Sequence, residues 1–270
     1  MKPSDAPAFM ICLERAKKCD KNFSTVKGLF PTLEWFRAVD GNDINVKDPK
    51  IVHPIGQFHI DTKTDTDHVH MTSKGVVGCS LSHIALWKKC VELNEPMFII
   101  EDDMRIGKKN RGKIKKAIDA IPESRIAFAS IMYIPAARSG GPYGPNKKWR
   151  KIESRDQLLG TQMYYITPVG AKILLANALP IVTHVDVYIG YIASISKVPF
   201  VKWGKHIYSY MEFFADNAAS SIGHGAPRIK KHMPDSNTFY VSILVLLIIL
   251  VITVCVIGPL YAKCRRRTHK

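Results

Sequence analysis

Short apolar runs alternate with amphipathic segments along most of the chain, and the two patterns predict strands and helices in turn. Residues 80–93 carry apolar side chains on one face and predict a helix that Ser80 caps. A second helix is expected to begin at Thr167 and Pro168 and to end before Pro180. Such alternation favours an α/β fold with a largely parallel sheet. The predicted strands are residues 7–13, 34–39, 96–100, 125–134, 161–167 and 198–203.

Three segments depart from this alternation. Residues 135–160 are rich in Gly, Pro and basic side chains, and their length is typical of a lid rather than of an ordinary connection. Residues 217–238 are polar and predict a stalk. Residues 239–262 contain no charged side chain, and a helix of that length crosses a hydrocarbon core of about 30 Å. We therefore expect a folded domain at 1–216, the stalk, a transmembrane helix and a basic tail at 263–270.

The side of the membrane is indicated by two signals that conflict. The early apolar run at residues 9–13 is flanked by Asp5 and Glu14, which is unlike a signal peptide and favours a tail-anchored protein with its folded domain in the cytosol. The basic tail at 263–270 favours the opposite orientation under the positive-inside rule. We give the first signal more weight and expect a single-pass protein with a cytosolic domain.

Composition narrows the class of partner. The chain has 270 residues, of which 46% are hydrophobic and 23% charged, as in folded proteins. Lys and Arg number 39 against 23 Asp and Glu, so the net charge of +16 favours an anionic partner. We expect no nucleic acid, because the chain has no basic helix with interleaved aromatics and no zinc-finger spacing. A basic tail-anchored scaffold protein is one interpretation of this charge.

The cysteines carry little functional signal. Cys12, Cys19, Cys79 and Cys90 show no CxxC spacing and no clustered histidines, so we expect them to be reduced and mostly buried thiols.

The clearest chemical signal is the sequence MFIIEDD at residues 97–103. A buried strand there delivers Glu101, Asp102 and Asp103 to its carboxyl end, where ligands bind in open α/β sheets. Adjacent carboxylates repel one another unless a cation neutralises them, and their oxygens suit Mg²⁺ or Mn²⁺. The alternative is a solvated acidic turn. The competing pair Asp65 and Asp67 follows no apolar strand and is interpreted as a surface loop.

Several ordered motifs resemble glycosyltransferase family 25, the group that contains bacterial lipooligosaccharide and procollagen galactosyltransferases. The most specific is GVVGCSLSHIALWKKCVELNEPMFIIEDD at residues 75–103, which is similar to the family pattern of G-x-x-G-C-x-x-S-H, a helix, a strand and EDD. FRAVDG at 36–41, YYITPVGAKIL at 164–174 and HVDVYIG at 184–190 also match. The resemblance covers roughly residues 8–224.

The resemblance implies a GT-A type, Rossmann-like nucleotide-diphosphosugar domain. Such an enzyme moves a hexose, typically galactose, from a UDP-sugar donor to a glycan, glycolipid or protein acceptor with inversion, as in lipopolysaccharide biosynthesis. Glu101, Asp102 and Asp103 would hold Mn²⁺ or Mg²⁺ against the donor diphosphate. The compact chain suggests a minimal enzyme of viral or microbial origin, anchored in a viral or host membrane.

The resemblance also nominates further site residues. Asp186 matches the later aspartate of the family and would act as the catalytic base, its alternative being helix N-capping. Ser82 and His83 match the S-H pair and would contact the donor nucleotide, although a histidine in this position is more often packed. Arg15 would face the phosphates, its alternative being a surface ion pair. In the lid, Lys147, Lys148, Trp149 and Arg150 would close over the diphosphate or grip an acceptor, or else form a solvated surface.

A second functional hypothesis keeps the fold but not the turnover. A catalytically inactive glycosyltransferase-like binding module would bind donor without forming product. The scaffold hypothesis predicts no donor binding at all, so donor binding and turnover together separate the three.

Overall fold

The computed structural model describes residues 2–15, 18–64, 71–104, 106–122, 126–134, 140–154 and 158–204. The chain divides into two compact units, residues 1–226 and 227–270, and the second lies wholly outside the described residues. The predicted stalk, transmembrane helix and basic tail, and the pair Asp65 and Asp67, also lie outside them. In the part of the chain that is described, no helix is both long and apolar enough to cross a membrane.

One mixed sheet of eight strands organises the fold, in the order β2-β1-β3-β7-β4-β8-β6-β5. Each of the predicted strands corresponds to a strand of this sheet. The strands are β1 (Ala8–Cys12), β2 (Leu33–Arg37), β3 (Met97–Glu101), β4 (Phe128–Ile134), β5 (Pro142–Tyr143), β6 (Trp149–Lys151), β7 (Leu159–Ile166) and β8 (Phe200–Trp203).

The prediction of a largely parallel sheet is wrong. β1 pairs in parallel with β2 and β3, and β4 pairs in parallel with β8. β7, however, runs antiparallel between β3 and β4, and β6 runs antiparallel to both β5 and β8. Apolar patterning identifies a buried strand but carries no information on its direction. The mixed sheet with its covering helices fits a Rossmann-like α/β fold.

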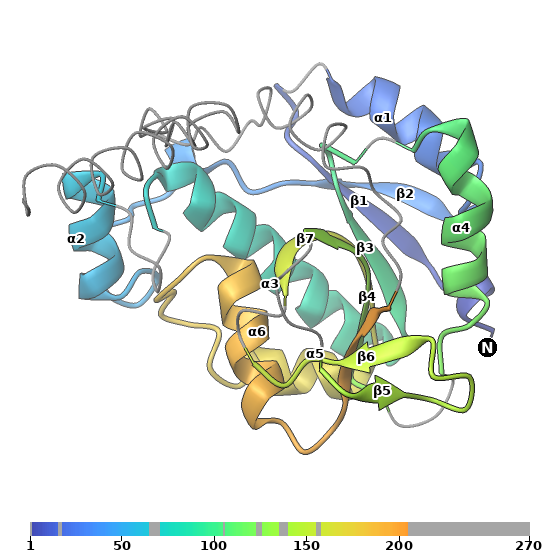
Figure 1. The fold of residues 1–270 in the computed structure, drawn as a ribbon. Coiled ribbons are helices and arrows are strands. Elements are labelled where there is room, and N and C mark those ends of the chain that lie inside the picture. Colours follow the sequence, from blue (N-terminus) through green and yellow to red (C-terminus); the bar gives the residue numbers. More distant parts are fainter. Residues whose placement is uncertain are drawn as a thin grey trace, which may run out of the picture. The chain divides into compact units, whose positions relative to one another are not determined.

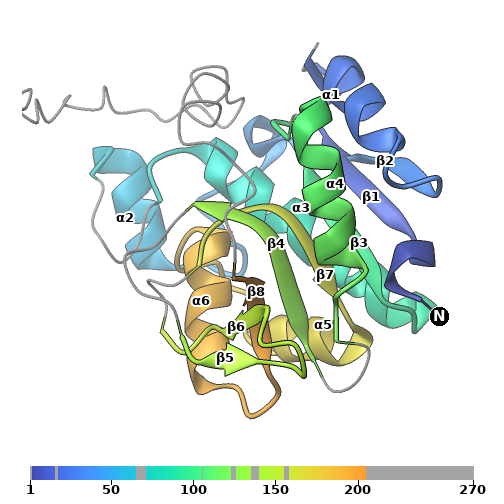
Figure 2. The same cartoon turned by 45° about the vertical axis from the view of Figure 1, so that its right-hand side comes forward.

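Helices cover both faces of the sheet. α1 and α4 lie on one side, and α3, α5 and α6 lie on the other (Figures 1 and 2). The helices are α1 (Lys18–Lys27), α2 (Pro54–Thr62), α3 (Lys74–Leu93), α4 (Lys108–Ile118), α5 (Pro168–Leu175) and α6 (Val185–Ile195).

The two predicted helix starts had different outcomes. The Thr167 hydroxyl oxygen accepts a hydrogen bond from the Gly170 N–H at 3.2 Å and caps α5, as predicted. α3 instead begins at Lys74, with Ser73 in the cap position, so Ser80 lies inside the helix and does not cap it. The glycines at 75 and 78 hid this earlier start, because glycine weakens a helical pattern in sequence.

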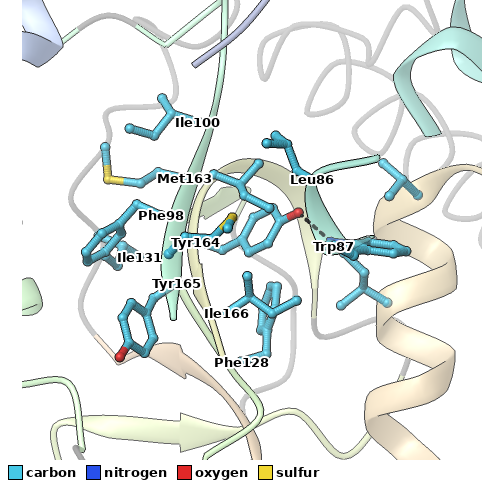
Figure 3. Close-up of a cluster of buried hydrophobic side chains, with 14 of the residues drawn as sticks. Leu86, Trp87, Phe98, Ile100, Phe128, Ile131, Met163, Tyr164, Tyr165 and Ile166 are labelled. Carbon is cyan, nitrogen blue, oxygen red and sulfur yellow. Dashed lines mark hydrogen bonds between the residues drawn. The ribbon is translucent and has the colours of Figure 1, made fainter. Parts of the chain in front are cut away.

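The core lies between the sheet and its two helical layers. Adjacent residues of β7 point to opposite faces, as the pleat requires. Tyr164 is directed toward Trp87 of α3, and Tyr165 points to the other side (Figure 3). There Tyr165 packs against Phe98 with a ring separation of 5.2 Å. Tyr164 therefore inserts its hydroxyl into the layer that α3 forms.

The segment predicted to be a lid joins the sheet edge in its described part. β5 and β6 form an antiparallel ladder, and Trp149 of β6 pairs with Trp203 of β8. The Trp149 side chain is buried, donates a hydrogen bond to the Ala120 carbonyl at 2.6 Å and packs edge-on against Trp203 at 5.1 Å. Trp149 is thus part of the core, so its predicted role in closing over the diphosphate is wrong.

The expectation of reduced cysteines is also wrong for one pair. Cys12, at the end of β1, forms a disulfide with Cys19 of α1, whereas Cys79 and Cys90 are free. The pair lacks the CxxC spacing that would have indicated it in the sequence. The two cysteines meet because the turn after β1 brings α1 back onto the end of that strand.

Candidate active site at the carboxyl ends of three strands

The carboxyl ends of β1, β2 and β3 meet at one edge of the sheet, because these strands are parallel neighbours. The segments that follow them surround a pocket with about 540 Å³ of empty space, including open solvent at its mouth. α3 closes one side. The lining residues are Ile11, Leu13, Arg15, Ala38, Val39, Asp40, Gly41, Gly75, Cys79, Ser82, His83, Glu101, Asp102 and Asp103. The structure thus brings Arg15, Ser82, His83, Glu101, Asp102 and Asp103 to this pocket, whereas Asp186 and residues 147–150 do not line it.

The three acids sit on a tight turn at the end of β3. The Met104 N–H donates to the Glu101 carbonyl at 3.1 Å and closes this turn. The Asn22 side chain of α1 donates to the Asp102 carbonyl at 2.7 Å. Both contacts engage the backbone, so they fix the turn while Asp102 and Asp103 line the pocket.

Ser82 joins α3 to the turn after β2. Its Oγ accepts from the Val39 N–H at 2.9 Å and donates to the Gly78 carbonyl at 2.7 Å. The approach is so close that a Cβ at Gly41 would lie 1.9 Å from the Lys74 carbonyl oxygen. The Ser82 hydroxyl therefore holds the wall of the pocket, and its contact with the donor stays a prediction.

Arg15 and Asp40 form an ion pair at the pocket. Arg15 Nε lies 2.7 Å from one Asp40 oxygen, and Nη2 lies 3.4 Å from the other. The hydrogen bond from Arg15 holds the pKa of Asp40 below its ordinary value, and the Asn42 N–H acts in the same direction. The Arg15 side chain is 55% exposed, so a phosphate could compete with Asp40 for it.

Side chains from β7 and α3 orient Glu101. The Thr161 hydroxyl of β7 donates a short hydrogen bond to Glu101 Oε1. The buried His83 Nε2 lies 3.4 Å from the same oxygen. His83 Nδ1 in turn lies 2.7 Å from the Tyr164 hydroxyl, to which the Trp87 indole donates at 2.9 Å. Two side chains from separate elements thus approach one oxygen of Glu101.

Cys79 lies near the carboxylates that were nominated from the sequence. Burial raises the pKa of its thiol well above the ordinary value, and the negative charges of Glu101, Asp186, Asp103 and Asp102 raise this pKa further. All four carboxylates are therefore near enough to act on one thiol, although Asp186 does not line the pocket.

Asp186 lies in the first turn of α6, after His184 in the cap position. His184 Nδ1 approaches Asp186 Oδ1 at 2.5 Å, and the Val187 N–H donates to this oxygen at 2.7 Å. The Gly160 N–H donates to Oδ2 at 2.9 Å. Burial by itself raises the pKa of Asp186, but the charge and hydrogen bond of His184 and the two N–H groups lower it overall. Both oxygens are engaged, so the role of catalytic base stays a prediction.

Sequence reasoning missed residues that the fold adds to the site. Cys79 was interpreted as an inert thiol, although its spacing of four from His83 places both on one helix face. Thr161 and Tyr164 belong to a strand remote in sequence, and no local signal connects them with Glu101. Asp40 lay inside a matching motif but was not nominated.

Two sets of ligand atoms meet in this pocket and share Glu101. The three adjacent carboxylates fit a hard ion such as Mn²⁺ or Mg²⁺. Among the described residues, one group of thiol, imidazole and carboxylate also has its ligand atoms within 4.8 Å of one another, namely Cys79, His83 and Glu101. That set would suit a softer ion such as Zn²⁺.

Comparison with known proteins identifies the family. A family model described as glycosyltransferase family 25 (LPS biosynthesis protein) matches residues 5–189. An Aedes aegypti protein named glycosyltransferase 25 family member is 30% identical over 188 residues, which are 67% of this chain and 30% of the relative. Human procollagen galactosyltransferase 2 is 27% identical over 132 residues, 48% of this chain and 20% of the relative. The chain therefore spans less than a third of these curated relatives. Because the family model matches more than half of it, the chain belongs to glycosyltransferase family 25.

Proposed function

We propose that the chain is a hexosyltransferase with a GT-A type domain. It moves a hexose, galactose first among the candidates, from a UDP-sugar to a glycan, glycolipid or protein acceptor with inversion. The observation that carries this proposal is the pocket at the carboxyl ends of β1, β2 and β3, which Glu101, Asp102, Asp103 and Arg15 all line. Family membership supports the reaction class, and the name of the human relative supports galactose.

The side chains of the pocket divide the work of binding the donor. Glu101, Asp102 and Asp103 would hold Mn²⁺ or Mg²⁺, which neutralises the charge that grows on the diphosphate as the sugar leaves. Arg15 binds a phosphate oxygen in place of Asp40. The acceptor hydroxyl forms its bond to the anomeric carbon on the face opposite the departing UDP, and its proton passes to a carboxylate, for which Asp186 is nominated.

The geometry of Asp186 also favours the second candidate, a binding module without turnover. A base works best with a pKa near the working pH, whereas the pKa of Asp186 is lowered and both of its oxygens accept hydrogen bonds. On this hypothesis Asp186 only holds α6 against β7, and donor binds without forming product.

One experiment separates these functions. The purified full chain in detergent is offered a panel of nucleotide sugars with Mn²⁺, Mg²⁺ or EDTA, and donor binding, hydrolysis and transfer are measured. We expect turnover of one UDP-sugar that EDTA abolishes and that Asp103→Asn lowers at least 100-fold. The control Asp119→Asn changes an exposed carboxylate in the turn after α4 and leaves turnover unchanged. Donor binding without product would support the binding module, and no binding at all would support the scaffold.

We also propose that residues 239–262 anchor the chain in a membrane, since this run is long and apolar enough to span one as a helix. The disulfide changes the side of the membrane on which we propose that the folded domain lies. The Cys12–Cys19 disulfide is typical of an oxidising compartment, and the basic tail at 263–270 favours a cytosolic C-terminus. We therefore propose a domain on the non-cytosolic side, in place of the cytosolic side that the sequence alone favoured.

A further inference from the structure

The buried hydroxyl of Tyr164 makes hydrogen bonds that determine which ring nitrogen of His83 carries a proton. The side chain is fully buried between the sheet and α3, and within the described residues its Oη contacts Trp87 Nε1 at 2.9 Å and His83 Nδ1 at 2.7 Å. An indole N–H can only donate, so Oη is the acceptor from Trp87 (Figure 3). The phenol proton then needs an acceptor, and His83 Nδ1 is the one within reach.

The tautomer of His83 follows from this contact. Because Nδ1 accepts the Tyr164 proton, the neutral imidazole carries its own proton on Nε2. Nε2 is buried, has no hydrogen-bond partner within ordinary distance among the residues that the structure describes, and faces Glu101 Oε1 at 3.4 Å. The ring stacks on Tyr164 at 5.7 Å with an interplanar angle of 20°, which holds it in this plane. The Nε2 proton is therefore aimed at the carboxylate.

We propose that Tyr164 fixes His83 as the Nε2–H tautomer, which makes His83 a positioning residue for Glu101 and excludes it as a metal ligand. A metal bound by Cys79, His83 and Glu101 would need the lone pair of Nε2, which carries the proton in this tautomer. His83 and Thr161 instead hold Glu101 Oε1 from two directions. The other oxygen, Oε2, is left for an ion or ligand in the pocket.

The N–H and O–H groups of these side chains therefore all point from the core toward the pocket. The indole of Trp87 donates to Tyr164, Tyr164 donates to His83, and the Nε2–H of His83 faces Glu101 Oε1 at 3.4 Å. An outer partner of this kind fixes the orientation of a ligating side chain and commonly alters metal affinity or activity by about 10- to 100-fold when it is removed. The consequence for metal binding rests on the proposed function, whereas the tautomer does not.

The tautomer can be read directly from the imidazole nitrogens. The full chain in detergent micelles, with ¹⁵N-labelled histidine, is observed by long-range proton–nitrogen correlation, and His83 is assigned by its loss in His83→Gln. We expect a protonated Nε2 and an unprotonated Nδ1, and in Tyr164→Phe a shift toward the Nδ1–H form because the phenol proton is gone. An Nδ1–H ring in the unaltered chain, or scalar coupling between His83 and added ¹¹³Cd²⁺, would overturn the proposal.

Metal affinity tests the positioning role separately. Free Mn²⁺ is titrated against the chain by electron paramagnetic resonance in the His83→Leu and His83→Gln variants. Gln keeps an N–H donor near the place of Nε2, whereas Leu has none. We expect Leu to weaken Mn²⁺ binding by about 10- to 100-fold and Gln to restore most of it, with stoichiometry unchanged. Equal affinity in all three chains would overturn the positioning role.

The two arms keep the inference apart from the proposed function. A chain that binds no Mn²⁺ under any condition contradicts the metal-dependent hexosyltransferase, yet its histidine nitrogens still report the tautomer. A chain with the expected tautomer and an unaffected Mn²⁺ affinity retains the proposed function and loses the role assigned to His83.

Discussion

At the scale of single residues, the wall of the pocket depends on small side chains and on hydrogen bonds that fix the backbone. Gly41 and Gly78 let α3 approach the turn after β2 closely enough for Ser82 to bond with the Val39 N–H. A Cβ at Gly78 would lie 2.5 Å from the Val39 carbonyl oxygen. The AVDG and GVVG sequences therefore contact each other in the fold, although they match the family as two separate motifs.

Gly41→Ala should destabilise the fold because the added methyl group meets backbone that cannot move aside. We expect a loss of about 1–3 kcal/mol in the free energy of unfolding, measured by urea denaturation. Gly112→Ala is the matched control, since no atom of the described residues outside its own helical neighbours lies within 4 Å of a Cβ there. In the exposed interior of α4 that change should add about 0.5–1 kcal/mol. Equal effects at the two positions would contradict the close approach.

The lowered pKa of Asp186 predicts a stability that depends on pH. The folded pKa lies below the ordinary value of 3.8, so the contribution is fully present above that value and is lost as the pH falls below it. Asp186→Asn should cost about 1.5–3 kcal/mol at pH 7, the usual worth of hydrogen bonds to a charged group. It should also flatten the loss of stability as the pH falls below 3.8.

The measurement is urea unfolding at several pH values, with Asp119→Asn as the control in an exposed position. Turnover in the same Asp186→Asn chain distinguishes the two roles of this carboxylate. A variant that stays folded at pH 7 and loses all transfer supports a base, and one that keeps transfer assigns Asp186 to the packing of α6.

At the scale of elements, the described part of residues 140–154 contributes a sheet edge instead of a lid. β6 pairs with β8, so the segment extends the sheet and gives Trp149 a position in the core. Its composition predicted a loop because Gly, Pro and Lys are frequent in loops, but a single buried tryptophan outweighs that local preference once β8 provides a partner.

Trp149→Ala should destabilise the domain by about 3–5 kcal/mol, because the change leaves a cavity beside Trp203 and an unpaired Ala120 carbonyl. Lys148→Ala, at the exposed neighbouring position, should change stability by less than about 0.5 kcal/mol. Thermal unfolding of both variants checks the prediction. A Trp149→Ala chain of unaltered stability with a weakened donor affinity would favour the original lid interpretation.

At the scale of the whole molecule, the proposed membrane anchor and the proposed side of the domain rest on the apolar run, the basic tail and the disulfide. We expect the full chain to stay in the membrane pellet after an alkaline carbonate wash, and a chain ending at residue 238 to be released. Release of both chains would contradict the anchor.

The disulfide distinguishes the two sides of the membrane. If the domain faces an oxidising lumen, Cys12 and Cys19 resist a thiol reagent until a reductant is added, and the domain survives protease added to sealed vesicles. Reactive thiols and a protease-sensitive domain would restore the cytosolic orientation. Cys79 and Cys90 are free thiols in the same chain, so the count of reactive cysteines is compared with and without reductant.

The sequence by itself determined β1, β2, β3, β4, β7 and β8, the capped start of α5 and the carboxylates at the end of β3. These depend on local physics, namely apolar runs, a capping hydroxyl and the place of ligands at strand ends. The family resemblance also nominated the site residues; the family match confirms the family, and the roles of these residues stay predictions.

Only the tertiary structure decided which residues meet. The antiparallel insertion of β7 brings Thr161 and Tyr164 to Glu101 and His83, and it could not be predicted because strand direction leaves no trace in hydrophobic pattern. The same insertion determines which ring nitrogen of His83 carries the proton, because a histidine tautomer depends on the hydrogen-bond partner of the other nitrogen. The sequence identifies the side chains of this pocket, whereas the positions of their protons and their hydrogen-bond partners depend on how the sheet packs.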